Sequence, residues 1–286
     1  MRIGVVGLGL IGGSLLRALR ATGYDADPAV RAAAAADGFA VVEAVSDLRG
    51  AELVLVAVPP GATADAVRAV LDALPDACVA DTASVKRGLP RAERFVAAHP
   101  LAGAERSGWA ASSAELVAGA AWAVCPAGEA LDPLLRLSAA VEALGGRLVP
   151  CTAEDHDAAV ARTSHVPHLV SRALAGLAPD SPLAGTAFRD MTRVARADAA
   201  LWAGILHANR DAVESALDEL GERLDELRAL LGDEARLREA WGTWPPAREP
   251  DWREQAVDGW PGLLAVRGAV RRLRLDGAVL RAEVAR

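Results

Sequence analysis

The chain has few cysteines, few aromatic residues and almost no lysine. Its 286 residues include 3 cysteines, and phenylalanine, tryptophan and tyrosine together make up 4%. Cys78, Cys125 and Cys151 are an odd set without a C-x-x-C pair, so the sequence predicts neither a disulfide framework nor a zinc site, and we expect no bound metal. This cysteine usage is typical of a reducing cytoplasm, where we expect the protein to reside.

The chain also lacks an excess of basic charge and long apolar runs. Its 31 basic and 38 acidic side chains give a formal net charge of -7, so nucleic acid is not an expected partner. No uncharged run approaches the ~20 residues of a membrane helix, and no membrane association is expected. The apolar start of the chain imitates a signal peptide, but glycines interrupt it and no A-x-A cleavage site follows.

Short β-type runs alternate with helical stretches through the first half of the chain. Seven segments have strand-like patterns: residues 2–7, 39–45, 53–58, 78–81, 95–98, 121–125 and 147–150. Several are continuous apolar runs, which are typical of parallel strands buried on both faces. Ala-rich amphipathic segments lie between them. We therefore predict an α/β fold with a doubly wound, Rossmann-type sheet that forms a dinucleotide-binding domain over residues 1–150.

After residue 151 the apolar positions recur at helical spacing, which predicts an all-helical domain over residues 151–286 for substrate binding and dimerisation. A leucine stripe runs along its longest helical stretch: Leu217, Leu220, Leu224, Leu227 and Leu231. Core packing and a homodimer surface both explain this stripe. From about residue 236, four of the 7 tryptophans occur among several prolines. We expect an aromatic-anchored arm there, with one possible strand over residues 278–284.

A glycine-rich turn follows the first predicted strand. Gly7-Leu8-Gly9-Leu10-Ile11-Gly12 is a G-x-G-x-x-G sequence between a strand and a helix. The first glycine permits the tight turn, Gly9 lets a pyrophosphate approach the backbone, and Gly12 allows the helix to pack against the strand. The helix-start amides, including those of Leu10 and Ile11, then face the phosphates. The motif predicts dinucleotide binding.

Asp25 is the candidate for the ribose of the dinucleotide. An acid normally follows the glycines by about 20 residues, whereas Asp25 and Asp27 come 13 and 15 residues after Gly12. The second strand must therefore be minimal or missing, or the first helix short. Because no arginine stands directly beside Asp25 in sequence, we expect NAD rather than NADP as the cofactor. The alternative is that this acidic pair only begins a helix.

Two polar motifs follow strand-like runs. The first extends from Asp81 through Ser84 to Lys86, the only lysine, and the second begins at His99 and contains Glu105. Because open α/β sheets bind ligands at the carboxyl ends of their strands, both motifs should face one crevice.

The helical half carries further polar residues. His156-Asp157 precedes Ser164-His165-Val166-Pro167-His168, in which His165 and His168 share a helix face. Asp190-Met191-Thr192-Arg193 precedes Trp202 and Asn209, which are expected in helix packing and in a polar network. Asp157 is expected to cap a helix.

These motifs together resemble the prephenate dehydrogenase family. The resemblance rests on G-L-G-L-I-G-G-S, D-T-A-S-V-K, H-P-L-A-G-A-E-R-S-G, H-D with S-H-V-P-H, and F-R-D-M-T-R, and it covers residues 1 to about 230. It implies an NAD-linked oxidative decarboxylation of prephenate to 4-hydroxyphenylpyruvate in tyrosine biosynthesis.

The resemblance also implies roles for individual residues. His99 is the expected base, because neutral imidazole accepts a proton near neutrality, and Ser84 is expected to hydrogen-bond His99 or the substrate hydroxyl. Arg193 is expected to bind the ring carboxylate, and His168 the substrate's side chain. Glu105 and His165 are expected in the same crevice.

Two other functions are compatible with these residues. An arogenate dehydrogenase, or a relative acting on an amino-substituted prephenate, would use the same motifs with a few different contacts. A non-catalytic dinucleotide-binding sensor is conceivable because the segment between Gly12 and Asp25 is short, although His99, Ser84 and Arg193 together argue for an enzyme.

Overall fold

The computed structural model describes residues 1–178, 181–242, 251–266 and 268–285. In these ranges the strands are β1 (Ile3–Val6), β2 (Thr22–Tyr24), β3 (Leu53–Val56), β4 (Cys78–Asp81), β5 (Phe95–Pro100), β6 (Ala121–Pro126), β7 (Arg147–Pro150), β8 (Trp252–Val257), β9 (Val270–Asp276) and β10 (Val279–Ala285). The α-helices are α1 (Leu10–Leu19), α2 (Pro28–Ala36), α3 (Pro60–Ala73), α4 (Asp132–Ala143), α5 (Ala153–Val160), α6 (Val166–Leu177), α7 (Thr186–Thr192), α8 (Ala199–Ala208), α9 (Arg210–Ala229), α10 (Glu234–Trp241) and α11 (Gly259–Ala265). Short 3-10 turns cover Val45–Leu48, Trp109–Ala111, Ala114–Leu116 and Arg193–Arg196, and a π-helical turn covers Ala161–His165.

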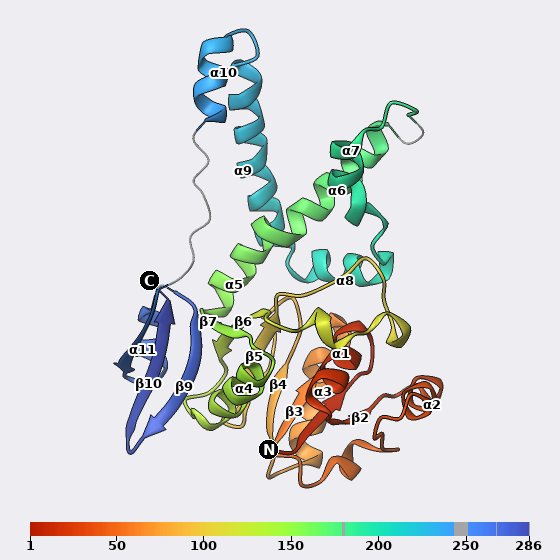
Figure 1. Ribbon diagram of the computed structural model, residues 1–286, viewed down its shortest axis with the longest axis vertical. Helices are drawn as coiled ribbons and strands as arrows, with labels where there is room; N and C mark the ends of the chain where they lie inside the picture. Colours follow the sequence, from red (N-terminus) through yellow and green to blue (C-terminus); the bar gives the residue numbers. More distant parts are fainter. Residues whose placement is uncertain (179–180, 243–250, 267, 286) are drawn as a thin grey trace.

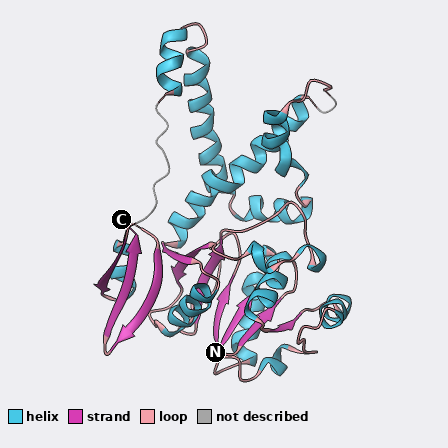
Figure 2. Ribbon diagram, viewed as in Figure 1, coloured by secondary structure: helices cyan, strands magenta, loops and turns pink. Residues whose placement is uncertain are grey.

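The described strands form one sheet in the order β2-β1-β3-β4-β5-β6-β7-β9-β10-β8 (Figures 1 and 2). The pairs from β2 through β5 are parallel, β6 runs antiparallel to β5, and β7 is parallel to β6. The last residues of β3 and β4 are fully buried, as expected of strands covered on both faces. The carboxyl ends of β1, β3, β4 and β5 therefore lie along one edge of the sheet.

Helices cover both faces of this sheet. One apolar cluster joins the sheet to Leu15 and Leu16 of α1 and to Leu134 and Leu137 of α4. The apolar cluster on the other face of the sheet contains Val67 and Val70 of α3 and Leu74, which directly follows α3. This arrangement confirms the predicted Rossmann-type doubly wound sheet.

The second strand is as short as the sequence requires. β2 has three residues, because α1 uses most of the chain between Gly9 and Tyr24. The strand predicted over residues 39–45 is wrong, since only an isolated bridge between Gly23 and Val41 forms there. A three-residue edge strand offers too few backbone groups to pair with a longer neighbour, and the apolar side chains of this segment pack as a loop instead.

Residues 153–241 are helical, as predicted, apart from the loops between elements. α5, the π-helical turn and α6 form one long rod, and α9 with α10 forms a second arm that diverges from it (Figure 1). Their shared apolar cluster is small: Ala161, Val166, Val213 and Ala216 are its buried members. Pro167 causes no break, since the wider π-helical turn directly precedes it and Pro167 sits in the first turn of α6.

The tail does not wrap the surface as an aromatic arm. Residues 252–285 add β8, β9 and β10 to the sheet beyond β7, and the strand expected over residues 278–284 is present as β10. Trp260 of α11 is buried against the sheet, and Trp241 at the end of α10 is exposed. Trp244 and the prolines 245, 246 and 250 lie outside the described residues. The last helix of the helical half therefore ends at residue 241, and the described chain that follows forms strands, of which β10 alternates buried and more exposed side chains.

Candidate functional site

The glycine-rich turn has the geometry that a dinucleotide pyrophosphate requires. Gly7 has φ +89°, and a Cβ there would lie 2.6 Å from the carbonyl oxygen of Ala57. A Cβ at Gly12 would lie 1.8 Å from the carbonyl oxygen of Gly7, so only glycine lets α1 approach the turn. A Cβ at Gly9 would meet nothing within 4 Å, and Gly9 provides no side chain to cap the first amides of α1. The turn thus leaves open space beside unpaired helix-start amides, including those of Leu10 and Ile11.

Asp25 lies directly against this turn. Its Oδ2 accepts a hydrogen bond from the backbone amide of Leu8 (2.7 Å) and its Oδ1 accepts from that of Asp27 (2.8 Å). The carboxylate therefore stands at the end of β2, where a ribose hydroxyl is bound in such folds, with lone pairs left to accept from it. It does not begin the next helix, since Asp27 caps α2 by accepting from the amide of Ala29.

Arg31 does not adjoin Asp25 in the sequence, but it contacts Asp25 in the fold. The Arg31 guanidinium donates to the carbonyl oxygen of Asp25 (2.7 Å) and to the Glu43 carboxylate (2.6 Å). Its charge is thereby compensated by Glu43, so Arg31 is not a free partner for a 2′-phosphate. The acidic Asp25 next to the turn favours NAD.

A buried ion pair joins the two polar motifs at the carboxyl ends of β4 and β5. The Lys86 ammonium contacts the Asp81 carboxylate, and both side chains are fully buried. Lys86 Nζ also donates to the carbonyl oxygen of Ala98 (2.6 Å), while Asp81 Oδ1 accepts from the amide of Ala98 (2.8 Å). The pair therefore holds both the backbone amide and the backbone carbonyl of Ala98, the residue before His99, and brings the two polar motifs into contact.

His99 is held by a second histidine rather than by Ser84. Its Nδ1 lies 3.0 Å from Nε2 of His156, and His156 Nδ1 lies 2.8 Å from Oδ1 of Asp157. The Asp157 carboxylate also accepts from the backbone amides of Lys86 (2.8 Å) and Arg87 (2.9 Å). These bonds tie the start of the helical half to the loop that contains Ser84.

The hydrogen-bond chain determines which nitrogen of His99 is basic. The carboxylate of Asp157 can only accept, so His156 Nδ1 carries the proton and its Nε2 is an acceptor. His99 must then donate from Nδ1, which leaves the lone pair of its Nε2 free. Burial, the Lys86 charge and the neighbouring His156 and His165 hold the pKa of His99 well below its usual range. His99 is therefore a neutral base at physiological pH.

His165 offers a hydrogen-bond donor with no partner in the described part of the chain. It is 1% exposed, and its Nδ1 lies 3.2 Å from Asn209 Nδ2, so Nδ1 accepts and Nε2 carries the proton. His165 Nε2 has no protein acceptor. Burial lowers the pKa of His165 to about 4. Asn209 also donates to the carbonyl oxygen of Asp157 (2.8 Å), which fixes α8 and α9 against α5.

His168 and Arg193 form the outer part of the site with Trp202. The His168 ring stacks on Trp202 with centroids 3.5 Å apart, while His165 meets the same indole edge-on at 6.0 Å. Arg193 Nη1 lies 3.5 Å from Oε2 of Glu105, and both side chains are largely exposed. Burial lowers the pKa of His168, and the Arg193 charge contributes. His168 Nδ1 donates to the Ser164 carbonyl oxygen (2.8 Å), so its Nε2 is an acceptor.

Ser84 does not orient His99 in the structure. It is half-buried in the loop after β4, and no hydrogen bond from its side chain to His99 occurs among the described residues. His156 and Asp157 perform the orienting role, so the expectation that Asp157 caps a helix is wrong; Thr152 caps α5. The histidines at positions 99 and 156 meet across 57 residues, a contact that no local sequence spacing can indicate.

The structure thus separates the predicted site residues into three groups. Gly7, Gly9, Gly12 and Asp25 surround the end of β1, and His99 lies beside His156 and near His165. Arg193, Glu105 and His168 form the outer group. In the strand order, β5 lies three strands from β1, about 14 Å at the usual strand spacing. A dinucleotide bound across the strand ends spans such a distance. Within the described residues no group of His, Cys, Asp and Glu side chains can hold a metal ion, and no helix is long and apolar enough to cross a membrane.

Two sequence models of one enzyme family match the chain. The nucleotide-binding domain of prephenate dehydrogenase matches residues 15–149, and the dimerization domain of prephenate dehydrogenase matches residues 152–240. The second match ends before the β8–β10 extension.

Individual relatives agree with these matches. A cyclohexadienyl dehydrogenase of Zymomonas mobilis is 33% identical over 260 residues, which are 81% of this chain and 89% of the relative. The crystal structure of Synechocystis arogenate dehydrogenase is similar with a TM-score of 0.70 at 30% identity, over 84% of this chain and 96% of that one. Prephenate dehydrogenase from A. aeolicus, in complex with hydroxyphenyl propionate and NAD+, gives a TM-score of 0.76 at 28% identity, over 84% and 95% of the two chains.

Replacing Asp25 tests the ribose contact. We expect Asp25→Ala to weaken NAD binding roughly 10- to 100-fold, the effect of losing hydrogen bonds to a charged group. Isothermal titration with NAD and NADP measures both affinities. Asp27→Ala, which removes a helix cap but leaves Asp25 in place, should bind NAD almost as the unaltered chain does. Tighter binding of NADP than of NAD by the unaltered protein would contradict the assignment.

The neutral buried histidines predict that acid destabilises the fold. Both His99 and His165 titrate below their ordinary pKa of 6.5 in the folded chain, and near it when unfolded. The unfolded state therefore binds more protons below pH 6.5. The free energy of unfolding should fall by about 1.4 kcal/mol per pH unit for each such histidine, until the pH reaches its folded pKa. Urea unfolding between pH 7 and pH 5 measures this slope.

The exposed His207 provides the control for this measurement. His207→Gln should leave the slope between pH 7 and pH 5 unchanged, because it removes an exposed side chain and leaves both buried histidines in place. An unfolding free energy that stays constant over this range in the unaltered chain would show that the buried histidines are not held neutral.

Proposed function

Because the chain belongs to the prephenate dehydrogenase family, we propose that it converts prephenate to 4-hydroxyphenylpyruvate with His99 as the base, in tyrosine biosynthesis. It is an NAD-dependent oxidoreductase. The observation that carries the proposed mechanism is the hydrogen-bond chain from Asp157 through His156 to His99, which leaves one basic nitrogen free.

The reaction requires few groups from the protein. Bound NAD supplies the hydride acceptor, and the glycine turn with Asp25 holds it. His99 Nε2 takes the proton of the ring hydroxyl as the hydride leaves, and loss of carbon dioxide then produces an aromatic ring. The proton taken up by His99 is stabilised by the Asp157 carboxylate acting through His156, as in other carboxylate-oriented histidines. Ser84, on the adjoining loop, is proposed to hydrogen-bond the same hydroxyl.

Two donors are proposed for the substrate's carboxylates. Arg193 is exposed at the outer edge of the site, and its guanidinium can bind the ring carboxylate through two parallel bonds. His165 Nε2–H is a buried donor that lacks a protein acceptor, and a substrate oxygen would satisfy it. Glu105 pairs with Arg193 and holds it near His168 until substrate binds.

One observation favours an amino-substituted substrate as the second candidate. His168 Nε2 is an acceptor, because its Nδ1 donates to Ser164, and the Glu105 carboxylate is a second acceptor on the same side. An ammonium group, as in arogenate or an amino-substituted prephenate, donates to such groups, whereas a keto group cannot. A dinucleotide-binding sensor without catalytic activity is the remaining alternative. The hydrogen-bond chain from Asp157 through His156 to His99 argues against it, because it leaves a basic nitrogen that a sensor does not need.

We propose that the protein is a cytoplasmic homodimer formed through its helical half. Leu217, Leu224, Leu227 and Leu231 remain 38%, 56%, 41% and 72% exposed, whereas Leu220 packs against the apolar cluster of the helical half, so the chain's own core covers little of the leucine stripe. A second copy that packs on the diverging helices would cover this stripe. The odd number of cysteines, without a C-x-x-C pair, supports a reducing compartment.

Formation of NADH with prephenate or arogenate tests the function and the base together. We expect turnover with at least one of these substrates. His99→Asn should lower kcat by about 10²- to 10⁴-fold with KM nearly unchanged, because the base acts in the transition state. His207→Asn replaces an exposed histidine of α8 and should keep full activity. Bound NAD without turnover of either substrate would favour the sensor.

Arg193→Gln tests the carboxylate contact. We expect KM for the substrate to rise roughly 100-fold, about 3 kcal/mol, with a smaller change in kcat. Steady-state kinetics separate the two constants. Arg196→Gln changes an exposed arginine of the same 3-10 turn and serves as the matched control. Equal KM values for the two variants would remove Arg193 from the substrate site.

The mass of the protein in solution tests the dimer. The chain has a mass of 29.6 kDa, and sedimentation equilibrium should give twice this value. Leu224→Asp together with Leu231→Asp should shift the equilibrium to monomers, since both side chains are exposed on the stripe. A monomer for the unaltered chain at concentrations of about 10 µM would contradict a stable dimer.

A further inference from the structure

Two of the three cysteines lie in contact. Cys125 Sγ on β6 and Cys151 Sγ after β7 are 3.7 Å apart. The β6–β7 register pairs Val124 with Pro150, and the Cys151 amide donates to the Val124 carbonyl oxygen (3.0 Å). The two cysteines are thus neighbours on parallel strands, about 4.8 Å apart at Cα. That separation lies within the range of disulfides, whose sulfur atoms are about 2.05 Å apart.

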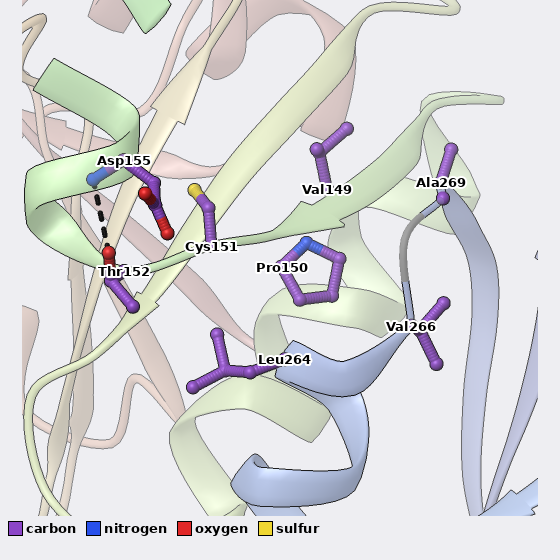
Figure 3. Close-up of a pocket in the computed structure, with 9 residues that line it drawn as sticks. Val149, Pro150, Cys151, Thr152, Asp155, Leu264, Val266 and Ala269 are labelled. Carbon is purple, nitrogen blue, oxygen red and sulfur yellow. Dashed lines mark hydrogen bonds between the residues drawn. The ribbon is translucent and has the colours of Figure 1, made fainter. Parts of the chain in front are cut away.

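Cys151 is partly exposed and lines a cavity, whereas Cys125 is buried. A cavity of about 530 Å³ lies between the end of β7 and the C-terminal extension, and Cys151 lines it with Pro150, Thr152, Asp155 and Val266 (Figure 3). Cys125, on the adjacent strand, is 1% exposed. The cysteine that lines the cavity thus has a buried thiol beside it.

The protonation states of the pair suit sequential oxidation. The hydrogen-bonding contact between the two sulfur atoms holds the pKa of Cys151 below its usual range, and the same contact together with burial raises the pKa of Cys125. Cys78 differs from both: burial and the adjacent Asp132 carboxylate raise its pKa to about 11. Because the thiolate is the reactive form, Cys151 reacts first and Cys78 stays inert.

Cys151 also adjoins the catalytic machinery. It directly precedes Thr152, whose hydroxyl caps α5 by accepting from the Asp155 amide (3.0 Å), and the first turns of α5 carry His156 and Asp157. Closing the sulfur–sulfur distance from 3.7 Å would pull the start of α5 toward β6. The 3.0 Å contact between His156 and His99 depends on that start.

We propose that Cys125 and Cys151 are a peroxide-sensitive thiol pair whose disulfide shifts α5 and switches off the base. The effect on catalysis rests on the proposed function, whereas formation of the disulfide does not.

The oxidant is a hydroperoxide. The Cys151 thiolate attacks one peroxide oxygen, the O–O bond breaks, and the alcohol or water leaves with a proton, so that the sulfur becomes a sulfenic acid. The Cys125 sulfur then attacks Cys151 Sγ, the S–O bond breaks, and water leaves with the Cys125 proton. The two thiols lose two electrons in total, and the peroxide gains them. A dithiol reductant reverses the change.

The first experiment counts thiols and maps the bond. The reduced full-length protein is treated with hydrogen peroxide, denatured, titrated for free thiols and digested for mass spectrometry without reduction. We expect two of the three thiols to disappear and a peptide pair linked through Cys125 and Cys151. The variant Cys78→Ser should form the same bond, and Cys151→Ser should form none. Three free thiols after treatment, or linkage to Cys78, would overturn the proposal.

The second experiment measures NADH formation on the same samples. We expect kcat to fall roughly 10- to 100-fold on oxidation, the effect of a small displacement of a catalytic group, and to return with dithiothreitol. Cys78→Ser should lose activity in the same way, and Cys151→Ser should resist. An active enzyme that forms the bond without losing turnover, or equal inactivation of Cys151→Ser, would overturn the switch. A chain inactive before oxidation refutes the proposed function, while its thiol count still decides the disulfide.

Discussion

The buried contact between Lys86 and Asp81 is the constraint on which the site depends. Two charges without solvent exposure are stable only when each satisfies the other and every remaining lone pair or proton has a partner. Here the Ala98 carbonyl oxygen accepts from Lys86 and the Ala98 amide donates to Asp81. These hydrogen bonds fix the end of β5 relative to the end of β4. His99 follows Ala98 directly. Breaking the pair would strand a buried charge, at a cost of about 3–5 kcal/mol, and would release the backbone that carries the base.

The same charges define the chemistry of the histidines. Burial and the Lys86 charge favour the neutral ring of His99. The Asp157 carboxylate fixes the tautomer of His156, which in turn fixes that of His99. The result is an imidazole with one defined lone pair, and in the proposed mechanism the Asp157 carboxylate stabilises the proton that this ring receives. Asn209 donates to Nδ1 of His165, whereas Nδ1 of His168 donates to the Ser164 carbonyl oxygen, so Nε2 is a donor in His165 and an acceptor in His168. The two histidines thus present opposite hydrogen-bonding groups although they lie only three residues apart in the sequence.

Particular elements show where sequence patterns succeed and fail. The glycine turn was predictable because its geometry arises from a few adjacent residues, and the buried strands from β3 to β7 were predictable because continuous apolar runs have few alternatives. The segment over residues 39–45 looks like a strand in composition, but its only neighbour, β2, is too short to pair with it. Strands β8 and β9 were missed because charged residues interrupt their apolar positions, and these charges are paired only in the fold: Arg271 of β9 with Glu283 of β10, and Arg272 with Glu142 of α4.

The sequence alone determined the Rossmann-type sheet, the position of the dinucleotide turn and the identity of the candidate site residues, since these depend on local periodicity and on motifs of adjacent residues. Tertiary structure decided which residues act on one another. His156 and Asp157 reach His99, and Cys125 meets Cys151, only because separate strands and a helix end at the same place. Hydrogen bonds between residues far apart in the chain depend on the packed fold, so no spacing in the sequence could have indicated the proton path.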